Sequence, residues 1–354
     1  MKEPLTELAE QFRQWYGHRQ GHSPVYETII TELIEDEDLL GLVAEAGRRD
    51  YVHYLFMGAV HHMLLEGNPH ELRRYYATTS PTPGPVDELF PYFRDFCFQH
   101  KTALLDAIAR HQVQINEVRR CTALLPAFAW ACRNATDVPL ALIDVGAAAG
   151  LNLLLDRFFY DYGPAGTVGD PDSDLMLACE PRGSLLPPLP RQMVRIDWRV
   201  GIDRQPVDVA DRHAVNWMIA LVAPDDRKRL AVLKSALEIA KSVPPKVVPG
   251  TGCDMLPGIL ARVPRDLTVC VFHCFTTHHF TLGEMDRFND ILNEFGAVRD
   301  FHVISLEWEG GKPAPPEPVP LRIASFEHGR RSDVTLAHVD WRGGCEWLEW
   351  LVHL

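Results

Sequence analysis

The residues best placed to bind a ligand lie in a short turn after an apolar segment of strand length. The apolar run begins at Leu140 and reaches Asp144, and the turn from Gly146 to Gly150 contains only glycine and alanine. Because no side chain in this turn is larger than a methyl group, backbone amides at the start of a following helix could approach a ligand closely. The pattern predicts a strand, a ligand-binding turn and a helix over residues 140–162.

This turn resembles the first motif of the S-adenosylmethionine-dependent methyltransferases, an acidic residue followed by three glycines at alternate positions. Asp144, Gly146 and Gly150 match the motif, and Ala148 replaces its middle glycine. The resemblance implies that these four residues and Asn152 hold the methionine half of the cofactor. The dinucleotide-binding fingerprint matches at only one of its three glycines. A tight turn without a ligand is the structural alternative.

Two acidic residues follow predicted strands and could hold the adenosine half of the same cofactor. Asp203 ends an alternating strand, and its two carboxylate oxygens could accept both hydroxyl protons of a ribose. Methyltransferases often carry an acidic residue after the third strand that binds the adenine amine, and Asp254 could have this role. A turn aspartate is the alternative for Asp203, and a helix N-cap is the alternative for Asp254.

His273 lies near the carboxyl end of another predicted strand. Ligands of open α/β sheets bind outside that edge. An imidazole there could contact the substrate or accept the proton that a nucleophile loses during methyl transfer. Since the chain contains 16 histidines, a simple hydrogen-bonding role is the alternative.

A polar run precedes the first strand. Residues 114–120 include Asn116, Glu117 and Arg120, and a short connection keeps consecutive elements adjacent in space. We therefore expect the run, at the start of a helix, to border the turn at Gly146. Asn116 and Glu117 would bind substrate, and Arg120 would pair with the cofactor carboxylate. A solvated helix face with ion pairs is the alternative.

The spacing of apolar residues along the chain, which predicts the elements that position these side chains, changes near residue 136. Residues 1–135 carry apolar residues at helical spacing and predict an all-helical N-terminal domain or cap, with helices at 4–17, 24–47, 51–66, 69–77, 87–110 and 114–134. Residues 136–354 alternate short apolar runs with helical patterns, as in a parallel α/β sheet. The predicted strands are 140–145, 194–202, 246–249, 267–275, 298–306, 321–327 and 334–341, and the predicted helices are 150–162, 212–222, 225–241, 255–262 and 282–295.

The last two predicted strands are joined by the short turn 328–333, which favours an antiparallel hairpin. The methyltransferase sheet likewise consists of parallel strands followed by an antiparallel hairpin. The expected fold class is therefore α/β, a Rossmann-like class I methyltransferase fold with a mostly parallel sheet. Two segments depart from a minimal fold of this kind, residues 163–191 and the proline-rich link 310–318. Each is either a surface loop or a lid.

Composition limits the partners. The net charge of −13 disfavours nucleic acid, and no apolar stretch is long enough to cross a membrane. The eight cysteines contain no Cys-x-x-Cys pair, which favours reduced thiols of a cytoplasmic protein and gives no zinc site. We expect a cytoplasmic protein with a small-molecule substrate. The oligomeric state is not indicated.

Segments along nearly the whole chain resemble one bacterial family, domain-of-unknown-function family 2332. They are Gly58–His61, Gln114–Val118 with Arg120, Gly146–Asn152, Gly201–Asp203 with Pro206–Asp208, and Trp347–Trp350. The family pattern differs at Ile115, Ala148, Arg119 and Gly250–Thr251, where it has threonine, serine, glycine and Gly-Asp. The resemblance brings no substrate.

The expected function is S-adenosylmethionine-dependent methyl transfer to an unknown small molecule. One alternative is a non-catalytic S-adenosylmethionine- or nucleotide-binding protein of the same fold. The other is a metal-dependent hydrolase that uses the histidines, among them His61, His62, His273, His278 and His279, although none has the spacing of a known zinc site.

Overall fold

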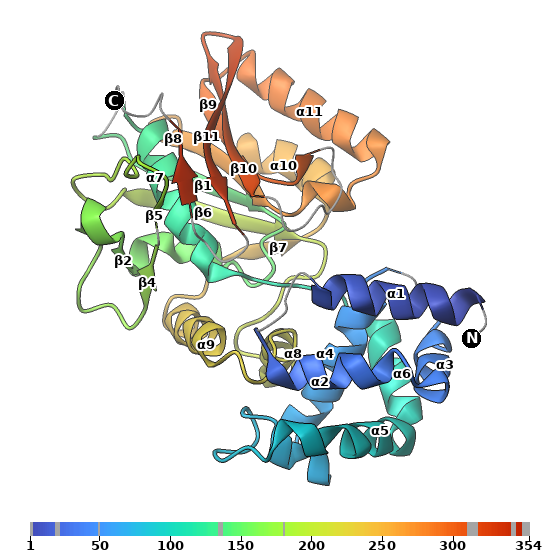
Figure 1. Ribbon diagram of the computed structural model, residues 1–354. Coiled ribbons are helices and arrows are strands. Elements are labelled where there is room, and N and C mark those ends of the chain that lie inside the picture. The colour runs from blue at the N-terminus through green and yellow to red at the C-terminus, as the bar shows by residue number, and fades with distance from the viewer. Residues whose placement is uncertain are drawn as a thin grey trace. The chain divides into compact units, whose positions relative to one another are not determined.

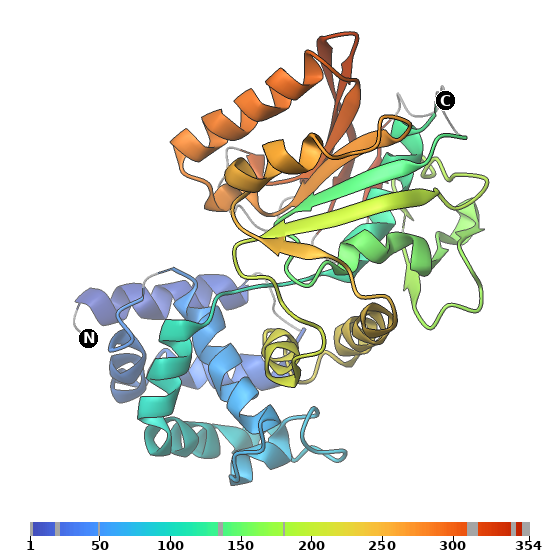
Figure 2. The same cartoon turned by 180° about the vertical axis from the view of Figure 1, so that it is seen from behind.

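The computed structural model describes residues 3–17, 22–48, 50–133, 137–179, 181–309, 318–340 and 345–348. The chain divides into two compact units, residues 1–115 with 210–233 and residues 116–209 with 234–354. Figure 1 labels their elements, and Figure 2 gives the same elements from behind. None of the described helices combines the length and apolar composition needed to cross a bilayer.

The first unit consists of helices around one apolar core. Its α-helices are α1 (Glu3–Gly17), α2 (Pro24–Leu33), α3 (Glu37–Ala44), α4 (Val52–Leu65), α5 (Leu89–Gln99), α6 (Lys101–Arg110) and α8 (Arg212–Ala220). Most of α4 is buried, and at Gly58 an added Cβ would lie only 3.1 Å from Leu221, just after α8. The absence of a side chain at Gly58 therefore lets α4 and α8 pack closely.

Four of the predicted N-terminal helices are wrong in detail, one of them being 114–134, whose α-helix begins only at Cys121. The predicted helix 24–47 is two helices, because the Asp36 side chain accepts a hydrogen bond from Leu39 N at 2.9 Å and begins α3. The predicted helix 87–110 is likewise divided at His100, and the predicted helix 69–77 is a 3₁₀ turn, Glu71–Tyr75.

The second unit contains a mostly parallel nine-stranded sheet, which confirms the predicted mixed α/β class. Its strand order is β5-β12-β11-β10-β9-β8-β1-β6-β7. The strands are β1 (Leu140–Val145), β5 (Pro181–Arg182), β6 (Ile196–Asp203), β7 (Val247–Pro249), β8 (Thr268–Cys274), β9 (Phe301–Leu306), β10 (Val319–Glu327), β11 (Arg330–Val339) and β12 (Cys345–Trp347). All seven predicted strands are present, and β10 and β11 form the predicted antiparallel hairpin.

The order of the parallel strands creates a topological switch point at the end of β1. Within the sheet, β6 and β7 lie on one side of β1, and β8 and β9 lie on the other. The connections that leave β1 and β8 therefore diverge. In open α/β sheets this switch point, outside the carboxyl ends of the strands, is where ligands bind.

Helices cover the two faces of this sheet. α10 (Gly252–Leu260) and α11 (Leu282–Gly296) pack on one face, over a core that includes Ile143 and Val145 of β1. α7 (Cys121–Ala131) lies on the other face, as Figure 1 shows. α11 begins with the predicted capping box between Thr281 and Glu284. α9 (Arg227–Ser242) runs from the first unit into the second.

The predicted helix 150–162 is wrong. After the turn, the chain forms a 3₁₀ segment, Leu151–Arg157, with a kink at Leu154, and then strand β2 (Phe159–Asp161). β2 pairs with β3 (Thr167–Val168) and β4 (Met176–Ala178) in a separate three-stranded sheet. The segment 163–191 therefore contributes β3 and β4 to this sheet and β5 to the edge of the large one. Residues 310–317 of the proline-rich link, and Trp350, lie outside the described residues.

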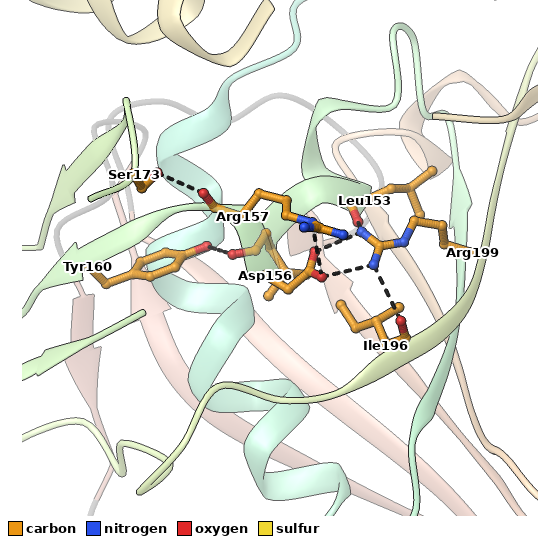
Figure 3. Close-up of polar contacts among 8 residues, drawn as sticks. Leu153, Asp156, Arg157, Tyr160, Ser173, Ile196 and Arg199 are labelled. Carbon is orange, nitrogen blue, oxygen red and sulfur yellow. Dashed lines mark hydrogen bonds and ion pairs between the residues drawn. The ribbon is translucent and has the colours of Figure 1, made fainter. Parts of the chain in front are cut away.

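Side chains from other elements explain why no α-helix forms here. The guanidinium of Arg199, on β6, donates to both carboxylate oxygens of Asp156 at 2.7 and 2.9 Å and to the Leu153 carbonyl at 2.8 Å. The Tyr160 hydroxyl donates to the Leu155 carbonyl at 2.7 Å. Figure 3 shows both sets of contacts. In an α-helix the carbonyls of Leu153 and Leu155 would accept hydrogen bonds from backbone amides. Here the side chains of Arg199 and Tyr160 donate to them instead.

We predict that Arg199→Lys lowers the free energy of unfolding by about 2–4 kcal/mol, because an ammonium group cannot bind a carboxylate bidentately and the Asp156 pair is mostly buried. Urea denaturation measures this loss. Arg195→Lys is the matched control, since its pair with Asp197 is exposed and should contribute less than about 1 kcal/mol. Equal losses in the two variants would contradict the role given to Arg199.

Candidate functional site

The turn after β1 has a backbone that small residues adopt most easily. Gly146, Ala148 and Gly150 have φ values of +86°, +50° and +71°, in the left-handed region. A Cβ at Gly146 would lie 2.2 Å from Thr276 Oγ1, and a Cβ at Gly150 would lie 2.9 Å from the Pro245 side chain. Both glycines are therefore required by packing as well as by conformation. Ala148, where the methyltransferase motif has glycine, carries a strain of roughly 1–2 kcal/mol.

The backbone amides of this turn are used within the protein. Gly146 and Ala147 donate to the Ile202 carbonyl, Ala148 to the Asp203 carboxylate, Ala149 and Leu151 to the Asn116 side-chain oxygen, and Gly150 to the Ala147 carbonyl. A phosphate at a helix N-terminus would need such amides to be available. Each amide from Gly146 to Leu151 therefore already has an acceptor within the protein.

Asp144, at the carboxyl end of β1, is a buried carboxyl group with an unsatisfied oxygen. It is 3% exposed, and its Oδ2 has no hydrogen-bond partner among the described residues. Burial, together with the nearby charge of Asp203 and against the opposing charge of Arg120, raises its pKa to about 8. Unsatisfied buried polar atoms are rare in native proteins and mark sites that a ligand could complete.

Asp203 ties the end of β6 to the turn. Its Oδ2 accepts from Ala148 N at 2.8 Å and its Oδ1 from Gln205 N at 2.9 Å. Both carboxylate oxygens of Asp203 therefore accept backbone amides. Asn152 is buried, and its Oδ1 accepts from Cys121 Sγ at 3.5 Å.

The polar run 114–120 borders the turn as expected, although it is not helical. The Asn116 side chain bridges two turn amides at 3.2 and 3.4 Å. Glu117 is buried and accepts two hydrogen bonds from the Arg119 guanidinium, at 2.8 and 2.9 Å. The α-helix begins only at Cys121, after a 3₁₀ turn. Asn116 and Glu117 are thus engaged within the protein.

Arg120 differs from these neighbours because its charge has no ion-pair partner among the residues that the structure describes. Its guanidinium lies over the Phe275 ring, 4.5 Å from the centroid, and Nη1 is 3.4 Å from the Cys274 carbonyl. The charge of Arg120 lowers the pKa of Asp144, so the guanidinium lies within electrostatic range of the end of β1. Arg120 is therefore available to bind an anionic group.

His273, near the end of β8, is paired with a residue that the sequence did not indicate. His273 is 6% exposed, and its Nδ1 lies 2.8 Å from Glu307 Oε1. Burial alone would raise the pKa of Glu307, but hydrogen bonds from His273 and from the amides of Thr276 and Thr277 hold the pKa below its usual value. The available signal for Glu307 was its position directly after a predicted strand, beside the strand of His273.

The structure does not bring all candidate side chains to one face of the sheet. Asp144 is in register with Phe272, whose ring meets Phe128 of α7. The next residue, His273, packs its ring on Phe288 of α11, with centroids 5.7 Å apart. Asp144 and His273 therefore leave the sheet on opposite faces, and the Thr276 contact with the Gly146 turn joins the two regions.

Asp254 is exposed in the first turn of α10. Its Oδ2 accepts from the Thr251 hydroxyl at 2.7 Å, and its Oδ1 is 3.5 Å from the Arg287 guanidinium. Thr251, rather than Asp254, is the N-cap of the helix, which begins at Gly252 instead of the predicted residue 255. The carboxylate is therefore engaged beside the end of β7.

The histidines do not assemble a metal-binding group within the described part of the chain. Both ring nitrogens of His61 have protein partners, the Ala220 carbonyl at 3.1 Å and the Thr78 hydroxyl at 2.8 Å. Burial, helped by the adjacent His279, lowers the pKa of His278 to about 4.

Comparison with known proteins identifies a family but no characterised relative. The model of the family described as "Uncharacterized protein conserved in bacteria (DUF2332)" matches residues 9–350. Neither the curated proteins nor the solved structures contain a match to the chain.

We predict that Asp144→Asn stabilises the protein increasingly as the pH rises. The folded-state pKa of about 8 lies above the unfolded value of 3.8, so the wild type loses stability as the pH rises from about 4 to about 8. Asparagine removes this loss, a gain of about 1.4 kcal/mol for each pH unit in that window. Denaturation curves at several pH values measure it.

Asp197→Asn, at an exposed position on β6, is the control and should change stability by less than about 0.5 kcal/mol at every pH. If Asp144→Asn and the wild type lose stability in parallel between pH 4 and pH 8, Asp144 is ionised in the fold and the prediction is wrong.

Proposed function

This chain belongs to the bacterial family DUF2332, and we propose that it transfers methyl groups from S-adenosylmethionine to a small molecule. The observation that carries the proposal is the chemical character of the turn at the switch point. Its amides are used internally, while the carboxyl groups of Asp144 and Asp203 flank it. Such a turn suits a ligand that brings positive charge and hydroxyl donors, and it does not suit a pyrophosphate.

S-adenosylmethionine has groups that complement these residues. Its ammonium group would supply the missing partner of the Asp144 carboxyl oxygen, and its ribose hydroxyls would donate to Asp203. Its carboxylate would accept a bidentate hydrogen bond from Arg120, whose charge is otherwise uncompensated among the described residues. Gly146, Ala148, Gly150 and Asn152 would line the methionine half.

The cofactor supplies an electrophilic methyl group on a sulfonium. The protein would contribute mainly by orienting the acceptor and the methyl group in line and by excluding water. In this proposal His273 receives the proton of the acceptor, at the carboxyl edge of β8. Asn116 would act indirectly by bracing the turn, and Glu117 by fixing Arg119 next to Arg120.

A second function is supported by the burial of His273. A base must reach its substrate, and at 6% exposure the imidazole offers little surface. The same binding residues would then serve a non-catalytic S-adenosylmethionine-binding protein. Turnover of labelled S-adenosylmethionine in the presence of a bacterial extract distinguishes the two functions, because a binding protein releases no labelled product.

We predict that S-adenosylmethionine and S-adenosylhomocysteine bind the folded protein and that Asp203→Asn weakens both by about 1.5–3 kcal/mol, the range for hydrogen bonds to a charged group. Asparagine keeps an acceptor for the Ala148 amide but loses the one for the Gln205 amide, so an unchanged melting temperature is required to show that the turn is preserved. Calorimetric titration measures the affinities, with Asp197→Asn as the control. No binding of either compound at millimolar concentration would reject the proposed function.

Arg120→Lys should separate the contacts to the two halves of the cofactor. We expect roughly tenfold weaker binding of S-adenosylhomocysteine, because lysine cannot form the bidentate pair with its carboxylate. Binding of 5′-methylthioadenosine, which lacks the amino acid part, should be unchanged, and so should the melting temperature. Equal weakening of both ligands would show that Arg120 does not bind the carboxylate.

A further inference from the structure

Glu307 uses one carboxylate oxygen to hold three groups. Oε1 lies 2.8 Å from His273 Nδ1, and it accepts from Thr276 N at 2.8 Å and from Thr277 N at 3.2 Å. The second oxygen, Oε2, is buried and has no hydrogen-bond partner among the described residues. Glu307 itself is 9% exposed, so these contacts are shielded from water.

This arrangement determines which ring nitrogen of His273 carries the proton. Hydrogen bonds from the ring and from two amides favour the ionised form of Glu307, and an ionised carboxylate is an acceptor only. His273 Nδ1 must therefore be the donor. In the neutral imidazole the other nitrogen, Nε2, then has a lone pair and can accept a proton.

The ring of His273 is also held by packing. Its edge-to-face contact with Phe288 has an interplanar angle of 84°. One hydrogen bond and one ring contact thus fix both the tautomer and the plane of the imidazole. A general base must be held in the correct tautomer and orientation, and a neighbouring carboxylate commonly has this role.

The same carboxylate fixes the loop after β8 against the turn after β1. Glu307 binds the Thr276 amide, and the Thr276 side chain fills the space beside Gly146, where a Cβ would lie 2.2 Å from Oγ1. Phe275, which links the end of β8 to Thr276, has a left-handed backbone with φ of +55°. Such strain persists only where the surroundings hold it. Glu307 therefore connects the position of His273 with the position of the turn.

We infer that Glu307 is the positioning residue for His273 and that the site takes a protic methyl acceptor, an alcohol, a phenol or an amine. The acceptor's oxygen or nitrogen forms a bond to the methyl carbon and gives its proton to His273 Nε2, while the carbon–sulfur electron pair remains on sulfur. The Glu307 carboxylate stabilises the resulting imidazolium. A carboxylate acceptor has no proton to lose and would need neither residue.

The assignment of Glu307 rests on the contacts above, while the acceptor class rests on the proposed function. The tautomer of His273 tests the first part without any ligand. In ¹⁵N-histidine spectra of the full chain, identified by comparison with His273→Asn, we expect Nδ1 protonated and Nε2 unprotonated. Glu307→Gln keeps an acceptor oxygen and should keep this tautomer, whereas Glu307→Ala should convert His273 mainly to the Nε2–H form. An Nε2–H tautomer in the wild type, or no change in Glu307→Ala, would overturn the assignment.

A second pair of variants serves if Glu307→Ala does not fold. His273→Asn places an amide nitrogen near the position of Nδ1 and can still donate to Glu307, whereas the nitrogen of His273→Gln lies nearer the position of Nε2. We expect His273→Asn to melt within a few degrees of the wild type and His273→Gln to melt several degrees lower. Equal melting temperatures, or the reverse order, would overturn the role of Glu307.

The acceptor class is tested with S-adenosylmethionine labelled in its methyl group and a bacterial small-molecule extract. Methyl ethers and methylamines survive mild alkali, whereas methyl esters release methanol. An alkali-stable labelled product, lost in His273→Asn, supports a protic acceptor. An alkali-labile product overturns it, and so does the absence of product from protein that binds the cofactor. Failure of cofactor binding would instead reject the proposed function and leave the tautomer result unaffected.

Discussion

The hydrogen bond from the Ala148 amide to the Asp203 carboxylate is the contact on which the candidate site depends. It holds a non-glycine residue in a left-handed conformation and joins the end of β6 to the turn after β1. It also keeps the negative charge of Asp203 close enough to Asp144 to raise the pKa of that carboxyl. The shape of the turn and the pKa of the neighbouring Asp144 carboxyl therefore depend on the same residue.

The second region of the site is organised around Glu307 in a comparable way. One carboxylate again accepts backbone amides and at the same time controls a titratable side chain, here His273. The two regions leave the sheet on opposite faces and meet where Thr276 packs against Gly146. Each carboxylate thus has a structural and an electrostatic role, which is why substitutions that preserve an acceptor oxygen are more informative than truncations.

The sequence predicted those features that depend on neighbouring residues. The strand that ends at Asp144, the capping box at Thr281 and the final hairpin are all local patterns, and the structure confirms them. The predicted helix after Gly150 is wrong because carbonyls in this segment accept hydrogen bonds from Arg199 and Tyr160. No local sequence pattern reveals these contacts.

Long-range contacts also explain what was missed at the site. The partner of Glu307 is His273, which lies 34 residues earlier in the chain. The sequence indicated only that an acidic residue follows a strand. The strands β5 and β12 have two and three residues, too few for an alternating pattern. The position of Asn116 beside the turn was expected from the sequence, but only the contacts show that Asn116 binds the turn amides whereas Arg120 lies over the Phe275 ring.

The internal use of the turn amides has a consequence for competition inside a cell. Nucleoside triphosphates and dinucleotides carry adenosine too, and any site for an adenosyl ligand encounters them. At this turn their phosphates would find no available backbone donor from Gly146 to Leu151 and would meet the negative charge of Asp203. Unsatisfied phosphate oxygens and like-charge repulsion disfavour such complexes. In the proposed function, this internal use of the turn amides would therefore also favour S-adenosylmethionine over nucleotides and dinucleotides.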